Sequence, residues 1–237
     1  MQVAPPAGVV GRAVAVDDEA MSTQRLTGTQ VAEQAPVGWT LLLGGLQTRL
    51  HTGSFATGLA VASAIGAIAE ELGHHPDLDL RYTHLDVRLR SHDVGGVTAR
   101  DIRLAQAVTG IAGDAGVELE CATVSRLELA LDTPDHHQVL PFWRAVLAME
   151  VPTEPDDELD DPFGMLPNVW FQKSGSEEPR QRWHPDLWVD PAEVQPRIDA
   201  AVAAGGTLVT DEFAPDFWVL ADPDGNRMCL CTWQGRG

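Results

Sequence analysis

Cysteine is scarce in this chain, which has only Cys121, Cys229 and Cys231 among its 237 residues. Their odd number and their spacings fit neither a disulfide framework nor the C-x-x-C pairs of a zinc clip. Free thiols are typical of a reducing compartment. The sequence therefore predicts a cytoplasmic protein whose stability does not depend on disulfide bonds.

Long hydrophobic runs are also missing. No stretch approaches the roughly 18 uninterrupted apolar residues that a membrane-spanning helix needs. The first ten residues contain no basic residue and include Pro5 and Pro6, whereas a secretory signal has a basic start followed by an unbroken apolar segment. We therefore expect neither a membrane span nor a secretory signal.

Positive charge is in short supply. Only 16 Lys and Arg residues stand against 35 Asp and Glu residues, which gives a formal net charge of -19. Such a field repels the phosphate backbone of nucleic acids and anionic lipid head groups. Hydrophobic residues make up 44% of the chain, as in ordinary globular proteins. We expect a globular protein that binds neither nucleic acid nor membranes.

The chain is long enough for two domains of ordinary size, and its composition changes near residue 120. Six of the seven tryptophans lie in the second part, from Trp143 onwards. A Gly-Asp-Ala-Gly stretch ends a helical pattern just before this point, and little periodicity follows it. We predict a leader or arm over residues 1–22, a first domain over 23–113, a linker over 114–124 and a second domain over 125–235.

The first domain alternates helical and hairpin patterns, as α+β proteins do. Gly44 and Gly45 separate two apolar runs and can supply the positive φ angles of a tight turn. A helical period of apolar residues then runs as far as Gly73, which can end the helix in a left-handed cap. Two alternating runs of opposite phase predict a second hairpin, and Thr98 with Asp101 forms the capping box of a last helix. The predicted order is helix, two strands, helix, two strands, helix.

Three histidines are candidates for acid–base catalysis. His74 and His75 follow the predicted helix end, with Glu70 one turn before His74 and able to orient its ring. An isolated pair of histidines at this place would simply favour the helix dipole. The second hairpin, however, carries the chain out and back, so His92 can return to the same neighbourhood. Neighbouring imidazoles oppose each other's protonation, so one can act as base while another acts as acid, as elimination of water requires.

Pterin-4a-carbinolamine dehydratases share a signature that this chain resembles in the run Glu70-x3-His74-His75-Pro76-x5-Tyr82-x9-His92-x8-Asp101. The resemblance extends over residues 26–111 and implies the same α+β fold. It also implies the activity of a hydro-lyase, 4a-hydroxytetrahydrobiopterin dehydratase. Such an enzyme eliminates water from 4a-hydroxytetrahydropterin to give quinonoid dihydropterin, and it requires no cofactor.

By position, the resemblance implies catalytic roles for the three histidines. His75 is expected to be the leading acid or base, His92 to protonate or hold the departing hydroxyl, and His74 to orient the pterin. Asp101 is expected to cap its helix rather than to touch substrate. Some members have a tryptophan where this chain has Leu78, so an aromatic wall is missing there. The residues expected around the substrate are Glu70, Asp77 and Ser91.

The second domain resembles glyoxalase-like members of the vicinal oxygen chelate superfamily, which predicts paired βαβββ units. A turn over residues 222–226, before the last strand, adds to the resemblance. In metal-using members the ligand positions correspond to Glu128, His184 and Cys229, but here a thiol replaces the usual final carboxylate. We expect a vestigial triad without metal, beside a cup that can take an unknown small ligand. The acidic run over 154–161 is expected to be a solvated loop.

Two alternatives to a dehydratase stay open. The second domain can carry the function, as a small-molecule binding protein or a metal-dependent enzyme, which bound metal or ligand in the cup would favour. The first domain would then be an association module without turnover. In every case we expect a homodimer or higher homo-oligomer, because exposed sheet edges can pair.

Overall fold

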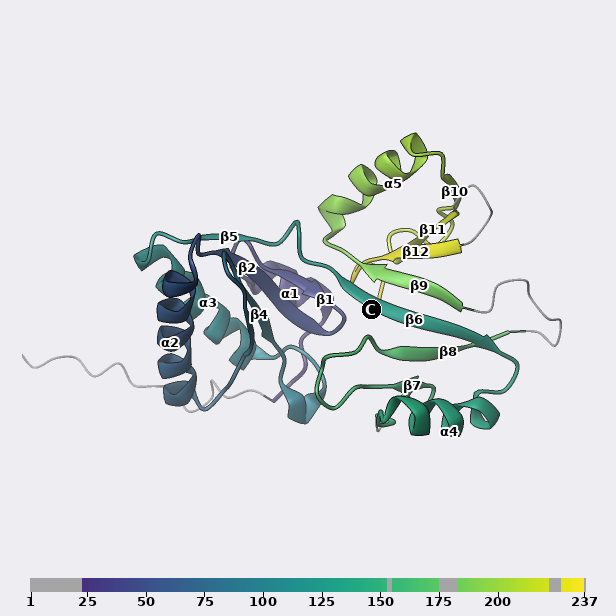
Figure 1. Ribbon diagram of the computed structural model, residues 1–237, viewed down its shortest axis with the longest axis horizontal. Coiled ribbons are helices and arrows are strands. Elements are labelled where there is room, and N and C mark those ends of the chain that lie inside the picture. Colours follow the sequence, from purple (N-terminus) through teal and green to yellow (C-terminus); the bar gives the residue numbers. More distant parts are fainter. Residues whose placement is uncertain (1–22, 153–154, 175–182, 222–226, 237) are drawn as a thin grey trace, which may run out of the picture.

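The computed structural model describes residues 23–152, 155–174, 183–221 and 227–236. Two sheets, each with helices packed against it, form an N-terminal and a C-terminal domain (Figure 1). The predicted α+β class is confirmed. The leader expected over residues 1–22 and the turn expected over 222–226 lie outside the described residues.

The N-terminal domain has the predicted order of helices and hairpins. Its sheet is antiparallel, with strand order β1-β2-β4-β3. Helices α2 and α3 pack against each other and lie beside this sheet (Figure 1). Its elements are α1 (Gly28–Gln34), β1 (Thr40–Leu42), β2 (Gly45–His51), α2 (Phe55–Leu72), β3 (Asp77–Leu80), β4 (Leu85–Leu89), η2 (His92–Val94), α3 (Ala99–Asp114) and β5 (Glu118–Glu120).

Strand β5 lies inside the segment 114–124, which was predicted to be a linker. Strand β1 is short and pairs only with the first residues of β2, from Gly45 to Gln47. The backbone of the second half of β2 therefore needs another partner, and β5 pairs with it from Arg49 to His51. This part of the expected linker is an edge strand of the first sheet.

The turn of the first hairpin differs by one residue from the prediction. Leu43 and Gly44 adopt the positive φ angles of 45° and 66°, as a two-residue turn of this kind requires. Gly45 is instead the first residue of β2. A Cβ atom there would lie 2.8 Å from Nε of Arg88 on the neighbouring strand, so this arginine packs directly on the glycine.

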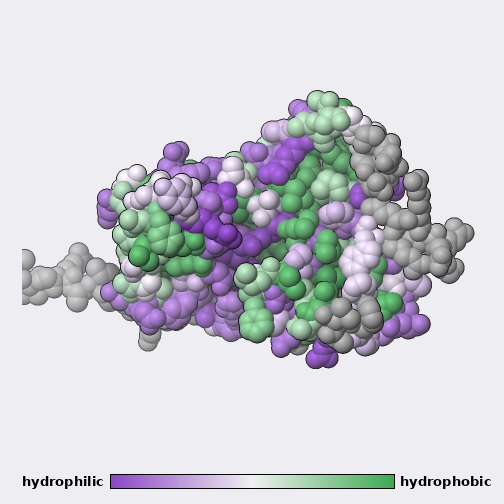
Figure 2. Space-filling view, viewed as in Figure 1, coloured by the Kyte–Doolittle hydropathy of each residue, from purple (hydrophilic) through white to green (hydrophobic). Residues whose placement is uncertain are grey.

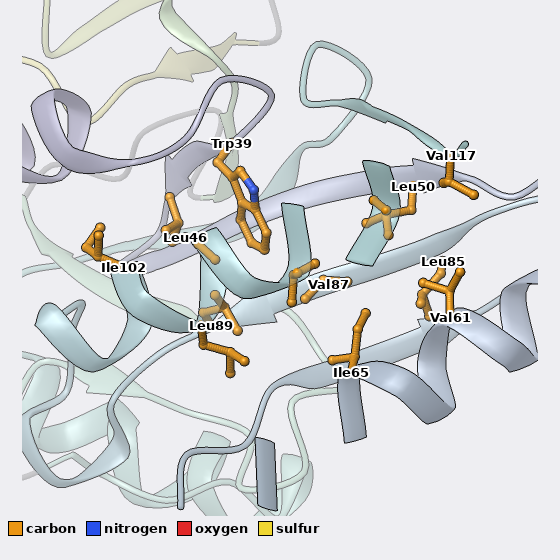
Figure 3. Packing of buried hydrophobic residues seen from close by; sticks show 14 of the residues in the cluster. Trp39, Leu46, Leu50, Val61, Ile65, Leu85, Val87, Leu89, Ile102 and Val117 are labelled. Atoms are coloured by element: carbon orange, nitrogen blue, oxygen red, sulfur yellow. The ribbon is translucent and has the colours of Figure 1, made fainter. Parts of the chain in front are cut away.

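The core of the N-terminal domain lies between the sheet and the two long helices (Figure 3). Helix α2 is apolar and long enough, by composition and length alone, to cross a membrane. Its residues Val61, Ile65 and Ala69, however, are buried in this core. The helix begins at the cap Ser54 and ends at Gly73, whose φ of 60° confirms the predicted left-handed cap.

The C-terminal domain has a seven-stranded sheet of order β10-β11-β12-β9-β6-β8-β7. Two tandem units join where β6 pairs with β9 in antiparallel orientation. Within the described residues, the first unit has one strand fewer than the predicted βαβββ pattern. The elements are β6 (Arg126–Thr133), α4 (His136–Leu147), β7 (Glu158–Leu159), β8 (Val169–Lys173), β9 (Trp183–Trp188), η3 (Pro191–Glu193), α5 (Val194–Ala203), β10 (Thr207–Thr210), β11 (Phe217–Ala221) and β12 (Arg227–Cys231).

Strand β7 corrects the prediction that the acidic run over 154–161 is wholly a solvated loop. Leu159 is fully buried, and Glu158 and Leu159 pair with Trp170 and Val169 of β8. The single leucine in the run decides its position, because burying it against the sheet brings the neighbouring backbone into hydrogen-bonding distance of β8.

A small hydrophobic cluster joins the two domains. Leu42, at the tip of the first hairpin, is fully buried and packs with Val124, Trp188 and Cys229. Beside this cluster, the Arg126 side chain of β6 donates a hydrogen bond of 2.7 Å to the side chain of Gln47 on β2. The two domains are therefore held together by apolar and polar contacts.

The core of the N-terminal domain can be tested with two substitutions in α2. Ile65 is fully buried, so Ile65→Ala should lower the free energy of unfolding by about 2–5 kcal/mol through lost burial and cavity formation. Leu59 lies on the same helix but is half exposed, so Leu59→Ala should cost less than about 1 kcal/mol. Urea unfolding measures both values, and equal losses would contradict this packing.

Candidate active site

Asp101 is a buried carboxylate that ties the two histidine segments together. Its Oδ1 accepts a hydrogen bond of 2.8 Å from Nε2 of His74. Its Oδ2 accepts one of 2.7 Å from the hydroxyl of Ser91, the residue before His92. The same oxygen accepts a 2.7 Å bond from the backbone N–H of Thr98, which completes the predicted capping box of α3. One side chain thus fixes a helix start and both histidine segments.

The environment of Asp101 keeps its carboxylate ionised. Burial by itself would raise the pKa of Asp101, but hydrogen bonds from His74, Thr98 and Ser91 together lower it below its ordinary value. A carboxylate with no exposed surface can remain charged because each oxygen has donors. His74 therefore faces a permanent negative charge near neutral pH.

The prediction that Glu70 orients His74 is wrong. Asp101 contacts His74 because the first turn of α3 packs beside the end of α2, which the sequence pattern did not reveal. Glu70 instead accepts a hydrogen bond of 3.1 Å from Nε2 of His75. Both side chains of this second pair are well exposed, at 80% for Glu70 and 61% for His75. Each histidine of the pair thus has its own carboxylate.

The three predicted catalytic histidines differ in exposure. The side chain of His74 is only 10% exposed, whereas His75 and His92 reach the surface. His74 and Ser91, the residue before His92, both donate hydrogen bonds to the carboxylate of Asp101. His74 therefore lies near the segment that carries His92. The structure brings these two segments together and leaves the ring of His75 in solvent beside them.

The residues predicted to surround the substrate fall in three different environments. Glu70 is exposed and paired with His75. Asp77 is exposed at the start of β3 and accepts a 3.3 Å hydrogen bond from Arg88. Ser91 is buried, and its hydroxyl supports Asp101 rather than reaching a cleft. The supporting role of Asp101 was missed because its position predicted only a helix cap.

A cleft of about 1330 Å³ lies between the two domains. One wall is the face of the first sheet that the helices do not cover, together with Pro76 and His92. The other wall includes Asp160 and the loop with Phe163 and Met165 of the C-terminal domain. The surface is mainly hydrophilic where the domains meet (Figure 2). Sequence could not predict this cleft, because its walls come from both domains.

The C-terminal domain gathers a second group of polar side chains in its cup. His184, Asp186 and Cys229 bring a nitrogen, an oxygen and a sulfur atom within 4.8 Å of one another. Asp186 pairs in register with Glu128 on one side and with Cys229 on the other. Glu128, His184 and Cys229 are the positions that the sequence singled out. Asp186 was missed, although the alternation of side chains along β9 puts it on the same face as His184.

Burial shifts the titration of this group towards neutral forms. It raises the pKa of Glu128 to about 7, with further contributions from the charges of Glu158 and Asp186. It also raises the pKa of Asp186, and that of the Cys229 thiol to about 12. The three clustered donors would suit a divalent ion such as zinc, but binding would require the thiol to lose its proton. The prediction of a triad without metal stays a prediction.

The Asp101→Asn substitution tests the buried carboxylate. At pH 7 the free energy of unfolding should fall by about 2–4 kcal/mol, because His74 and Ser91 lose a charged partner. The folded-state pKa of Asp101 is lowered, so its stabilising effect is present above the unfolded-state value of about 3.9 and is lost as the pH falls. The difference from wild type should therefore shrink in urea unfolding at about pH 3.

Asp114, exposed at the other end of the same helix, provides the control for this experiment. Asp114→Asn should change the free energy of unfolding by less than about 0.5 kcal/mol at either pH. If Asp101→Asn lowers the free energy of unfolding by the same amount at both pH values, the charge of the Asp101 carboxylate does not cause the stabilisation.

Comparison with known proteins assigns a family to each part of the chain. Residues 22–111 match the model of pterin 4 alpha carbinolamine dehydratase, and residues 128–231 match that of a glyoxalase-like domain. A relative from Natronomonas pharaonis, provisionally named a pterin-4-alpha-carbinolamine dehydratase, is 36% identical over 84 residues, which are 35% of this chain and 91% of the relative. One of the same name from Chloroflexus aurantiacus is 34% identical over 91 residues, 38% of this chain and 98% of the relative.

A solved structure from Brucella melitensis, described as a transcriptional coactivator/pterin dehydratase, is 31% identical. It aligns over 38% of this chain and all of its own, with a TM-score of 0.37. The two sequence relatives are aligned over nearly their whole length, 91% and 98%, at identities above 30%. The chain therefore belongs, through its N-terminal domain, to the pterin-4-alpha-carbinolamine dehydratase family, and it continues into a glyoxalase-like domain.

Proposed function

We propose that the protein is a 4a-hydroxytetrahydrobiopterin dehydratase, a hydro-lyase whose catalytic groups are His74, His75 and His92. The observation that carries this proposal is the hydrogen-bonded link through Asp101, which holds the segments of His74 and His92 side by side. Membership of the family supports the reaction class. The free thiols of the described cysteines agree with a cytoplasmic setting.

The reaction needs one proton donor and one proton acceptor. The C4a–O bond breaks as the lone pair of the neighbouring ring nitrogen forms a C4a=N5 double bond. One imidazolium gives its proton to the departing hydroxyl, which leaves as water, and one neutral imidazole takes the proton from the nitrogen. Positioned proton transfer of this kind contributes about 10²- to 10⁴-fold in rate.

The different exposures of the three histidines support a different role for each. His92 lines the interdomain cleft and can reach the hydroxyl of a ligand bound there. The side chain of His75 is 61% exposed, so it can exchange protons with solvent, and its Nε2 donates a hydrogen bond of 3.1 Å to Glu70. His74 is largely buried, and Asp101 fixes its ring. We assign His92 to the departing hydroxyl, His75 to acid–base exchange, and His74 to orientation of the pterin.

The His75→Ala substitution tests this assignment. Because it removes the exchangeable imidazole, the rate of carbinolamine dehydration should fall at least tenfold. The measurement uses 4a-hydroxytetrahydropterin generated by an aromatic amino acid hydroxylase. His51→Ala is a matched control, since His51 is also an exposed histidine paired with a glutamate, Glu120, at 3.0 Å. If both variants keep the wild-type rate while circular dichroism shows intact folding, His75 is not catalytic.

Removal of metal provides a separate test. In the proposed reaction, imidazoles and ring nitrogen lone pairs carry out every step, so no cofactor takes part. Exhaustive treatment with a chelator should therefore leave the dehydration rate within about twofold of its starting value. A large loss that is restored by zinc would show that this proton-transfer scheme is incomplete.

A second candidate function lies in the C-terminal domain. The concave face over β6 and β9 is mostly hydrophobic (Figure 2), and it carries the buried group of His184, Asp186 and Cys229. Apolar walls with a few polar groups are typical of small-molecule sites. Under this alternative the N-terminal domain is an association module. Binding of an unknown ligand or metal in the cup, together with no turnover of a pterin, would favour it.

We also propose that the protein forms a homodimer or higher homo-oligomer. Strand β3 ends the path of the first sheet, and its residues are largely exposed, so its backbone groups can pair with a second copy. Light scattering coupled to size exclusion should give at least twice the chain mass of 25.5 kDa.

A further inference from the structure

Six arginines line the same cleft as His92. Arg49, Arg81 and Arg126 are hydrogen-bonded to side chains of the protein, which leaves Arg25, Arg88 and Arg90 as candidates for binding a ligand. Arg88 and Arg90 alternate with the core residues of β4, so both lie on the face of the sheet that the helices leave uncovered. Arg25, just before α1, comes to the same wall from a different part of the chain. Acids also line the cleft, but Asp79 and Asp86 are paired with Arg81 and Arg49, and Asp93 is paired with Arg100.

Close contacts hold these arginines in place. A Cβ atom on Gly45 would lie 2.8 Å from Nε of Arg88, and one on Gly96 would lie 2.6 Å from Nε of Arg25. Both guanidinium groups therefore lie directly against glycine backbone. Nη2 of Arg90 donates a hydrogen bond of 3.2 Å to the backbone oxygen of Gly95. The arginines are ordered parts of the wall.

The described part of the protein provides only some of the hydrogen-bond acceptors and carboxylate partners that these arginines could use. Nε of Arg90 is buried, and no described residue accepts a hydrogen bond from it. Among the ion pairs of the described residues, none involves Arg25 or Arg90, and Arg88 has only an exposed partner, Asp77, at 3.3 Å. Burial, followed by repulsion from neighbouring arginines, lowers the pKa of Arg90. An anion in the cleft would supply the missing partner.

Two acids of the C-terminal domain act on Arg90 electrostatically, but neither fills this role. Asp160 acts on Arg90 electrostatically, but its carboxylate accepts a 2.6 Å hydrogen bond from Asn168. Glu158 also acts on Arg90, yet burial and the charges of Asp160 and Asp157 raise the pKa of Glu158 to about 7. This acid therefore carries only part of a negative charge near neutral pH.

We propose that the ligand of the interdomain cleft carries an oxyanion on its side chain, which Arg88 and Arg90 bind while the ring of the ligand reaches His92. Guanidinium groups match the oxygens of phosphate and carboxylate with paired hydrogen bonds. The cleft of about 1330 Å³ has room for a bicyclic ring together with a charged side chain. That the ring is a pterin rests on the proposed function, whereas the anion site rests on the arginines.

Two pairs of ligands test the proposal with the full-length protein. The first pair is 7,8-dihydroneopterin and its monophosphate, and the second is 6-hydroxymethylpterin and 6-carboxypterin. Affinities are measured by fluorescence titration at about 50 mM salt, where electrostatic contacts are only partly screened. We expect at least tenfold tighter binding of the charged member in one pair, and that pair identifies phosphate or carboxylate as the preferred anion.

Substitutions test whether the arginines cause the tighter binding of the charged ligand. Arg90→Gln should remove at least fivefold of the advantage of the charged ligand and leave the affinity for the neutral ligand unchanged. Arg81→Gln is the matched control, because Arg81 lines the same cleft but is already paired with Asp79 through two hydrogen bonds. Arg90→Lys keeps the charge and should be intermediate. If the Arg90→Gln protein does not fold, the Arg90→Lys variant can still be measured.

Inorganic pyrophosphate separates this proposal from the function proposed above. If neither pterin pair binds but pyrophosphate binds wild type at least fivefold more tightly than Arg90→Gln, the anion site stands and the pterin assignment fails. Equal affinities for charged and neutral pterins would overturn the anion site and leave the dehydratase intact. Absence of binding by all these ligands would overturn both.

Discussion

The hydrogen bonds of Asp101 are the contact on which the N-terminal site depends. A buried carboxylate is costly unless donors surround it, and here His74, Ser91 and the start of α3 supply them. Each of these donors belongs to a different segment of the chain. The same side chain that begins a helix therefore also fixes where the histidines lie, so stability and chemistry are coupled at this residue.

The cleft that contains His92 depends on the contacts between the two domains. Leu42 at the tip of the first hairpin is buried among residues of the C-terminal domain, and Arg126 reaches back to Gln47. These contacts leave the uncovered face of the first sheet opposite a loop of the second domain. A surface that would be open in an isolated dehydratase-like domain thus becomes one wall of a cleft, and arginines on that wall are partly removed from water.

The cup of the C-terminal domain shows how strand register concentrates charge. Pairing of β6, β9 and β12 puts Glu128, Asp186 and Cys229 side by side on one face. Burial raises the pKa of both acids, and for Glu128 the charges of Glu158 and Asp186 add to this effect and bring the pKa to about 7. A ligand or ion that binds to these three side chains would therefore change their protonation.

Most of the helices and strands could be predicted from local sequence patterns, because hydrophobic period, helix caps and turn residues act over a few neighbouring positions. Gly73 and the capping box of Thr98 and Asp101 are examples, and both were predicted correctly. The order of elements and the resemblance of each half to a family followed from the same local patterns. The candidate histidines followed from their places at a helix end and after a predicted hairpin, and from the resemblance to a family signature.

The contacts between distant residues became known only from the three-dimensional fold. In the fold, His74 is hydrogen-bonded to Asp101 and not to Glu70. Part of the expected linker pairs with β2 as an edge strand, and Asp186 lies beside His184 and Cys229 in the cup. The fold also forms the cleft with its arginines from two domains. These outcomes depend on contacts between residues far apart in the chain, and such contacts are fixed by packing and by the pairing of buried polar groups, which no local pattern encodes.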